Sequence, residues 1–249
     1  MEFQKKLMST NIYHDLIFFL SALTIYNVFV IGISKTLPQL LIALITVSLL
    51  DILINYIKSK RFIRPYHTII TALFIATILP TGQAWYVPAI ISAIAILSKH
   101  LININKRHLF NPAMFGLFFS ALLFNQSSQW WATSPLPVIL IFGLFIAYKF
   151  RRLHLALSYI VTILLLGFIL APSTFSVASI LNLNYFFIFF MLVEPMSSPI
   201  YKKGRILFGF LAAVLVFSFS TYITNFSPYI LALLAANLFV PLINKYVRN

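Results

Sequence analysis

Long apolar runs separated by short basic clusters dominate this sequence. A helix needs about 20 apolar residues to cross a bilayer. Measured against that length, the runs divide into ten segments with approximate limits 14–33, 38–57, 66–79, 84–99, 111–124, 135–149, 153–171, 175–194, 205–223 and 227–244. Strands of a membrane barrel would alternate in polarity and be about ten residues long, so the runs predict helices.

The composition agrees with a chain that lies mostly in lipid. Hydrophobic residues make up 61% of the 249 residues and charged residues only 9%, whereas a soluble domain carries about 25% charged residues. A soluble globular protein and a disordered chain are therefore excluded. We predict an all-α integral membrane protein of about ten transmembrane helices, forming one membrane domain over residues 1–249.

The basic residues test this count of segments and orient the chain. Of the 18 Lys and Arg residues, all but Lys35 fall at the N-terminus, in even-numbered loops or in the C-terminal tail. Basic loops stay in the cytoplasm, so both termini are predicted to be cytoplasmic. Topogenesis and contact with anionic lipid then explain the net charge of +14 without nucleic acid. Position alone does not support the alternative, an anionic ligand at the cytoplasmic face.

Several kinds of chemistry are absent from the sequence. The chain has no cysteine, which excludes disulfides, thiolate metal sites and a cysteine nucleophile. It contains no zinc-ligand spacing, P-loop or dinucleotide fingerprint. We therefore predict no catalytic residue and no metal ligand, and a hydrolase or a nucleotide-driven pump is not expected.

Proline-containing segments repeat along the chain. Leu79-Pro80 corresponds to Glu194-Pro195 at an offset of 115 residues, and Asn111-Pro112 corresponds to Ser227-Pro228 at 116. Each repeat, approximately 1–125 and 134–249, holds five predicted spans. Because five is odd, the second repeat enters the membrane from the opposite side, which predicts two inverted five-helix repeats.

The third and eighth segments are predicted to be short or broken helices. Residues 66–79 would span about 21 Å, less than the roughly 30 Å hydrocarbon core. Proline ends both segments and leaves carbonyl groups that protein, water or a ligand must satisfy in lipid. Paired interruptions of this kind indicate a binding cavity. The alternative is two ordinary helix ends followed by turns.

Two carboxylates stand out because ionisable groups are costly in a membrane. Glu194 either contacts a ligand or cation, or pairs structurally near Lys202, Lys203 or Arg205, and the sequence leaves both open. Asp51 is expected to make a structural pair with the basic loop at Lys58, about 10 Å along the helix.

The segment from Arg107 to Ala113 carries the most specific polar pattern. Arg107, His108 and Asn111 are suited to contact a planar, hydrogen-bonding ligand, with Phe110 stacking on it. The alternative is a helix cap beside a basic cluster.

Three stretches resemble one family. The stretch from Thr71 to Pro80, followed by Trp85, is similar to a TALLLALxLPP…W pattern, and Lys106–Gly116 (KRHLFNPAMFG) is similar to GRNxFNPAxxG. Met191–Gly209 is similar to MATDPVTSPxxxxGRxIFG. Over roughly residues 60–247, the chain thus resembles the family that contains the RnfD protein of Rnf-type electron-transport complexes and the NqrB protein of the sodium-pumping NADH:quinone reductase.

The resemblance implies a function. It implies an electron-transfer subunit without independent catalytic activity, in the inner membrane of a prokaryotic cell, working with other membrane and soluble subunits of an ion-translocating complex. It also implies noncovalent riboflavin or FMN near His108 and Asn111, although His108 stands where the family pattern has Asn. The predicted cofactor-binding residues are Thr71, Pro80, Thr81, Arg107, His108, Phe110, Asn111, Pro112, Glu194, Pro195, Ser197 and Ser198.

The outer loop departs from the family. Members carry covalent FMN on the Thr of a Ser-Gly-Ala-Thr sequence after the fifth span. Here Ala132-Thr133 is preceded by Trp130-Trp131, so covalent flavin at Thr133 is not expected. Two rival functions stay open: a transporter or channel for a small solute such as riboflavin, and an assembly subunit without a cofactor.

Overall fold

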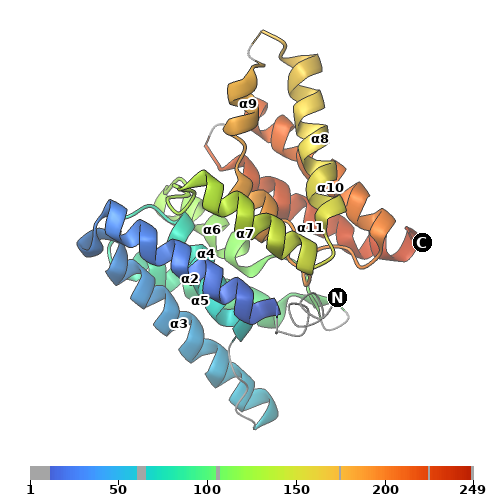
Figure 1. The fold of residues 1–249 in the computed structure, drawn as a ribbon. Helices are drawn as coiled ribbons and strands as arrows, with labels where there is room; N and C mark the ends of the chain where they lie inside the picture. The colour runs from blue at the N-terminus through green and yellow to red at the C-terminus, as the bar shows by residue number, and fades with distance from the viewer. Residues whose placement is uncertain (1–11, 61–65, 105–106, 174, 224, 248–249) are drawn as a thin grey trace, which may run out of the picture. The chain divides into compact units, whose positions relative to one another are not determined.

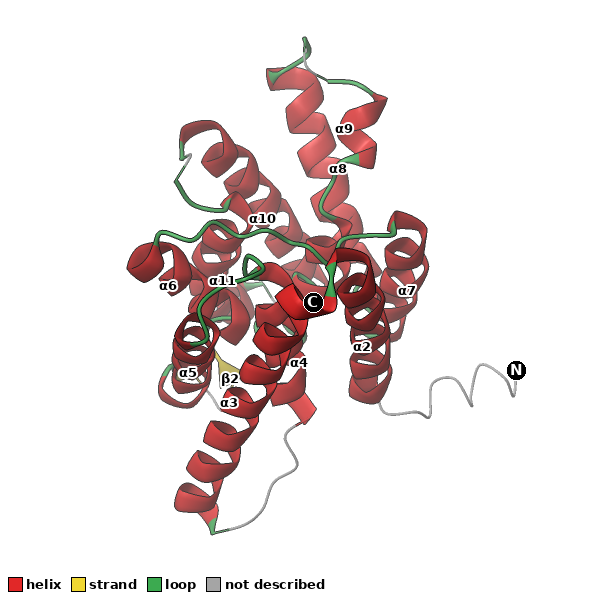
Figure 2. Cartoon of the chain, turned by 90° about the vertical axis from the view of Figure 1, so that its left-hand side faces the viewer, coloured by secondary structure: helices red, strands yellow, loops and turns green. Residues whose placement is uncertain are grey.

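The structure is a computed structural model that describes residues 12–60, 66–104, 107–173, 175–223 and 225–247. Helices account for nearly all of the drawn chain (Figures 1 and 2). They are α2 (Ile12–Ile31), α3 (Ile33–Ser59), α4 (Tyr66–Ile78), α5 (Tyr86–Leu101), α6 (Pro112–Phe124), α7 (Leu136–Lys149), α8 (Leu153–Leu170), α9 (Val177–Leu181), the π-helix η1 (Phe187–Met191), α10 (Lys202–Tyr222) and α11 (Pro228–Tyr246). Strands β1 (Asn103–Ile104) and β2 (Arg107–His108) pair in a short hairpin.

The helices confirm the predicted class of fold. Among the described residues, five helices are long and apolar enough to cross a membrane: α2, α3, α8, α10 and α11. Four shorter apolar helices, α4 to α7, complete the series together with the eighth segment. That segment is broken into α9 and η1, as the sequence predicts. The chain is an all-α membrane protein.

The chain divides into two compact units. The first contains Met1–Asn103 and Pro112–Ser134, and the second contains Ile104–Asn111 and Pro135–Asn249. In the first unit α2 and α3 pack on α4, α3 packs on α5, and α5 packs on α6. In the second, α7 and α8 pack on η1, α8 packs on α10, and α10 packs on α11. The order of packing is therefore the same in both units.

The two short elements form the centres of their units. Every residue of α4 from Ala72 to Ile78 is buried, and so is every residue from Phe186 to Val193 around η1. A helix that is apolar on all sides is most stable where other helices surround it. Helix α4 ends at Ile78, shortly before Pro80, and η1 ends at Met191, one turn before Pro195.

The start of α3 differs from the prediction. The sequence predicts a span from 38 to 57, the limits of its apolar run. Instead α3 begins at Ile33, and Pro38 and Lys35 lie within it. The break from α2 is made by Gly32, whose φ of 119° favours glycine.

Candidate functional site

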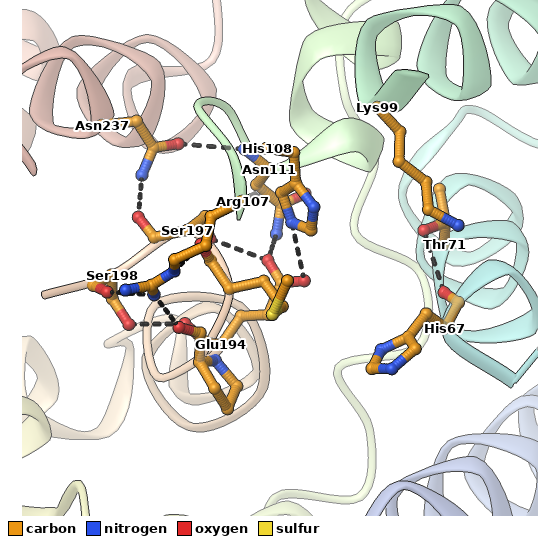
Figure 3. Close-up of polar contacts among 12 residues, drawn as sticks. His67, Thr71, Lys99, Arg107, His108, Asn111, Glu194, Ser197, Ser198 and Asn237 are labelled. Carbon is orange, nitrogen blue, oxygen red and sulfur yellow. Dashed lines mark hydrogen bonds and ion pairs between the residues drawn. The ribbon is translucent and has the colours of Figure 1, made fainter. Parts of the chain in front are cut away.

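Glu194 lies in the turn that follows η1, at the centre of a polar cluster in the second unit (Figure 3). Its Oε2 accepts hydrogen bonds from Nδ2 of Asn111 and Oγ of Ser197, both at 2.8 Å. Its Oε1 lies 3.5 Å from Nε2 of His108. The carboxylate is thus held by two of the three sequence segments that carried the family pattern.

The guanidinium of Arg107 binds backbone carbonyl groups of the same turn. Its guanidinium donates to the carbonyls of Met196 at 3.2 Å, Ser198 at 2.8 Å and Pro195. These carbonyls follow the end of η1, where proline stops the helical bonding pattern. Arg107 therefore donates hydrogen bonds to carbonyl groups that have no helical N–H partner, and lipid could not satisfy these groups.

Two more arginines donate hydrogen bonds to the same turn. Arg152 is 4% exposed and donates to Oγ of Ser198 and to the carbonyl of Pro199. Arg205 donates to the carbonyls of Pro199 at 3.2 Å and Ile200 at 2.6 Å. The carbonyl groups left by the break are thus satisfied by protein.

Helix α11 fixes the turn from the other side with two amides. Asn237 accepts from the backbone N–H of Asn111 at 3.0 Å and donates to the carbonyl of Ser197 at 2.8 Å. Asn244 accepts from the backbone N–H of Ile200 at 2.9 Å. The two Asn residues are seven positions apart, so they lie on one face of the helix.

His108 borders a small cavity beside this cluster. The ring is 9% exposed, and its Nε2 has no hydrogen-bond partner among the described residues, although Glu194 is within ion-pair distance. The cavity has a volume of about 140 Å³. Its lining includes Arg107, His108 and Asn244, with Leu109, Met196 and Val240 as apolar walls.

Comparison with known proteins identifies the family. The profile of the NQR2, RnfD, RnfE family matches residues 3–135 and 119–249. The chain belongs to this family. The resemblance inferred from the motifs is confirmed at this level.

Curated relatives of this NQR2, RnfD, RnfE family member share part of its sequence. They include the D component of the ion-translocating oxidoreductase complex from Escherichia coli O81 (strain ED1a), O6:K15:H31 (strain 536 / UPEC) and O1:K1 / APEC. Each is 34% identical over 106 residues, which are 40% of this chain and 30% of the relative. The match therefore spans less than a third of the length of these relatives.

Most of the predicted site residues of this family member come together in the second unit. They are Arg107, His108, Asn111, Glu194, Pro195, Ser197 and Ser198. Phe110 is half-buried next to them in the sequence. Lys106, the first residue of the same motif, lies outside the described residues, as do Lys5, Lys6, Arg61, Arg64 and Arg248.

The remaining predicted residues belong to the first unit. Pro112 opens α6, and Thr71 donates to the carbonyl of His67 within α4 at 3.2 Å. Pro80 follows α4, and the N–H of Thr81 donates to Oε1 of Gln129 at 3.0 Å. Their part in a flavin site stays a prediction.

Carbonyls at the end of α4 are also satisfied by protein. Gln39 donates to the carbonyls of Ala76 at 2.8 Å and Leu79 at 3.1 Å. The indole of Trp131 donates to the carbonyl of Ala76 at 2.8 Å. Trp131, the second residue of the Trp pair, therefore has a structural role, while Thr133 beyond it is exposed.

The prediction that Asp51 pairs with the basic loop at Lys58 is wrong. Asp51 is 2% exposed and bonds to Nζ of Lys99 at 2.9 Å, Nε2 of His100 at 2.7 Å and Oγ1 of Thr68 at 2.6 Å. Lys58 instead donates to the carbonyl of His100 at 3.2 Å. The packing of α3 on α5 brings the last turn of α5 to Asp51, whereas Lys58 is two helical turns away.

Sequence reasoning did not select Asn237, Asn244 or Arg152. An Asn inside an apolar span is itself a signal, because an amide in lipid needs a polar partner. Two such residues one above the other on α11 are a stronger signal. Nothing in the basic cluster around Arg152 distinguishes it from its neighbours.

Proposed function

We propose that this chain is a membrane subunit of an ion-translocating oxidoreductase complex and passes electrons through noncovalently bound riboflavin or FMN. Its membership of the NQR2, RnfD, RnfE family and the names of its E. coli relatives support the complex. Its other subunits would supply the electrons, since the sequence contains no nicotinamide-binding fingerprint.

One observation carries the flavin part of the proposal. The Arg107–Asn111 segment and the Glu194–Ser198 segment are more than 80 residues apart in sequence and share a network of hydrogen bonds. That network leaves Nε2 of His108 without a hydrogen bond among the described residues and next to a cavity. A buried ring nitrogen in this position is suited to a ligand.

The lining of the cavity fits part of a flavin ring. The isoalloxazine system has one edge with carbonyl and N–H groups and one apolar edge. His108 and the Nδ2 group of Asn244 would bind the polar edge, and Leu109, Met196 and Val240 would contact the apolar part. The volume of about 140 Å³ is below the roughly 300 Å³ of the smaller ligand pockets, so the cavity would take the polar edge and not the whole cofactor.

The residues around the cavity would have different roles in binding the flavin. Asn111 and Ser197 hold the Glu194 carboxylate in place, 3.5 Å from Nε2 of His108. Nε2 of His108 would donate or accept a proton at the ring edge according to the redox state of the cofactor. The flavin, when bound, supplies the electron-transfer chemistry that no side chain in this site has.

The test is a spectrum of the detergent-purified protein before and after acid precipitation. Yellow colour released into the supernatant is expected. His108→Phe and Asn244→Leu should each weaken flavin retention by about fivefold or more, the value of one lost hydrogen bond. His67→Phe is the matched control, because His67 lies in the first unit against Tyr13 and Phe preserves a ring there.

The outcomes separate the rival functions. Protein without flavin, even after reconstitution with riboflavin or FMN, would refute the proposal. Flavin retained in the pellet would indicate covalent attachment, with Thr133 as the first residue to examine. Riboflavin uptake into liposomes without an electron donor, by protein whose flavin cannot be reduced, would favour the transporter.

A further inference from the structure

A second cavity lies in the second unit where α7 ends and where α8 and α10 begin. Its volume is about 360 Å³. Its lining consists of Tyr148, Arg151, Leu153, His154, Lys202 and Arg205. It shares no lining residue with the cavity beside His108.

Positive charge in this cavity is not balanced by acidic side chains. Glu194 is the sole acidic residue in the sequence of the second unit, and Asn111 and Ser197 hold its carboxylate in the other site. Arg151, Lys202 and Arg205 line the cavity together with His154. Like charges at such short range favour a bound anion.

Several donors that line the cavity are free to bind such an anion. Arg151 and Lys202 are exposed, and neither side chain has a hydrogen bond or ion pair among the described residues. Nε2 of His154 is buried and has no hydrogen-bond partner in the same part of the chain. The His154 ring is half-buried and lines the cavity, so this nitrogen adds one polar atom to the cavity wall.

The backbone at the start of α10 also favours a bound anion. Helix α10 has 21 residues and begins at Lys202, and no side chain caps its N-terminus. The first turn therefore presents free N–H groups and the positive end of the helix dipole. Arg205 forms one wall of the cavity. Its guanidinium is held there by hydrogen bonds to the carbonyls of Arg151 and Ile200.

We propose that this cavity binds a phosphate group, carried either by an anionic phospholipid or by a soluble phosphate compound. The free side chains of Arg151 and Lys202, the positive charge of Arg205 and a helix N-terminus match the several acceptor oxygens of a phosphate. Tyr148 and Leu153 give the cavity an apolar side that suits a lipid glycerol and acyl chain. Basic pockets between membrane helices are known to hold such headgroups.

The test uses the full-length protein in nanodiscs that contain equal amounts of phosphatidylglycerol and phosphatidylcholine. Lipids that stay bound after transfer to neutral detergent are counted by native mass spectrometry. In parallel, inorganic phosphate is titrated against the protein in neutral detergent, and the thermal unfolding midpoint is recorded. Arg151→Gln and Lys202→Gln remove charge from the cavity. Lys203→Gln is the control, because it removes the same charge from the next residue of α10, which does not line the cavity.

Retained phosphatidylglycerol that falls about fivefold with Arg151→Gln or Lys202→Gln, but not with Lys203→Gln, would support a lipid headgroup. A phosphate-dependent rise in the unfolding midpoint with the same pattern, and no lipid preference, would support a soluble phosphate compound. Equal losses in all three variants would show diffuse attraction to the membrane and overturn the proposal. No binding of either probe would overturn it as well.

Discussion

Two adjacent arginines show how far identical residues can differ in environment. Arg151 is exposed, has φ of 55° and borders the basic cavity. Arg152 is 4% exposed and bonds to Ser198 and Pro199. The sequence places both in one basic cluster, and only the second is part of the interior.

Removing the guanidinium of Arg152 should therefore destabilise the fold. Arg152→Met removes the guanidinium donor from the buried Oγ of Ser198, which costs about 1–3 kcal/mol. The carbonyl of Pro199 keeps Arg205 as a donor. Arg151→Met in neutral detergent is the control and should change the thermal unfolding midpoint little. Equal midpoints for the two variants would contradict the structural role of Arg152.

Asp51 is the second residue whose burial predicts a large effect. Asp51→Asn leaves Lys99 and His100 without their carboxylate, and breaking a buried ion pair from one side costs about 3–5 kcal/mol. Adding Lys99→Gln to this variant should recover part of the loss, because the uncompensated cation is then gone. Thermal unfolding of the single and double variants measures both effects. A double variant less stable than Asp51→Asn would argue against an ion pair.

At the scale of elements, the short third segment and the broken eighth segment agree closely with prediction. The limits 66–79 match α4 (Tyr66–Ile78), and the segment 175–194 is divided into α9 and η1. Short length and Pro80 or Pro195 made these breaks visible in the sequence. The groups that satisfy the free carbonyls were not visible, because Gln39, Trp131 and three arginines reach them from other parts of the chain.

Close packing between α8 and α10 depends on Gly209. A Cβ at this position would lie 2.5 Å from the carbonyl oxygen of Leu155 and 3.1 Å from Cβ of Ser158. Glycine at such contacts lets membrane helices approach closely. Gly209→Ala should therefore cost about 1–3 kcal/mol through overpacking, although alanine favours helix.

The matched control for this change is Gly167→Ala in α8. Its Cβ would meet the ring of Phe175 at 3.3 Å, and a side chain can move where a backbone carbonyl cannot. Thermal unfolding in detergent should show a lower midpoint for Gly209→Ala than for Gly167→Ala. The opposite order would mean that the two helices can separate without penalty.

At the scale of the whole molecule, the distribution of basic residues predicts the orientation of the chain. The loop after α3 should be cytoplasmic and the loop between α6 and α7 should face the other side. The absence of cysteine makes this prediction simple to test. Ser59→Cys and Ser127→Cys replace exposed serines at the end of α3 and in the loop after α6.

A membrane-impermeant maleimide should label Ser127→Cys in intact cells and Ser59→Cys only after the membrane is permeabilised. Labelling of both positions in intact cells would refute an odd number of crossings between them. The same pair of positions in proteoliposomes of known orientation is the control for access of the reagent.

The sequence alone determined the membrane class, the ten apolar segments, the two breaks and the two motifs that meet at Glu194. These features are local, because they depend on hydrophobicity, proline and spacing along the chain. Tertiary structure alone decided that Arg152 is buried, that Asp51 pairs with Lys99 and His100, and that Asn237 and Asn244 hold the turn. Such partners lie on different helices, and in an apolar medium the polar groups that packing brings together must bond with one another.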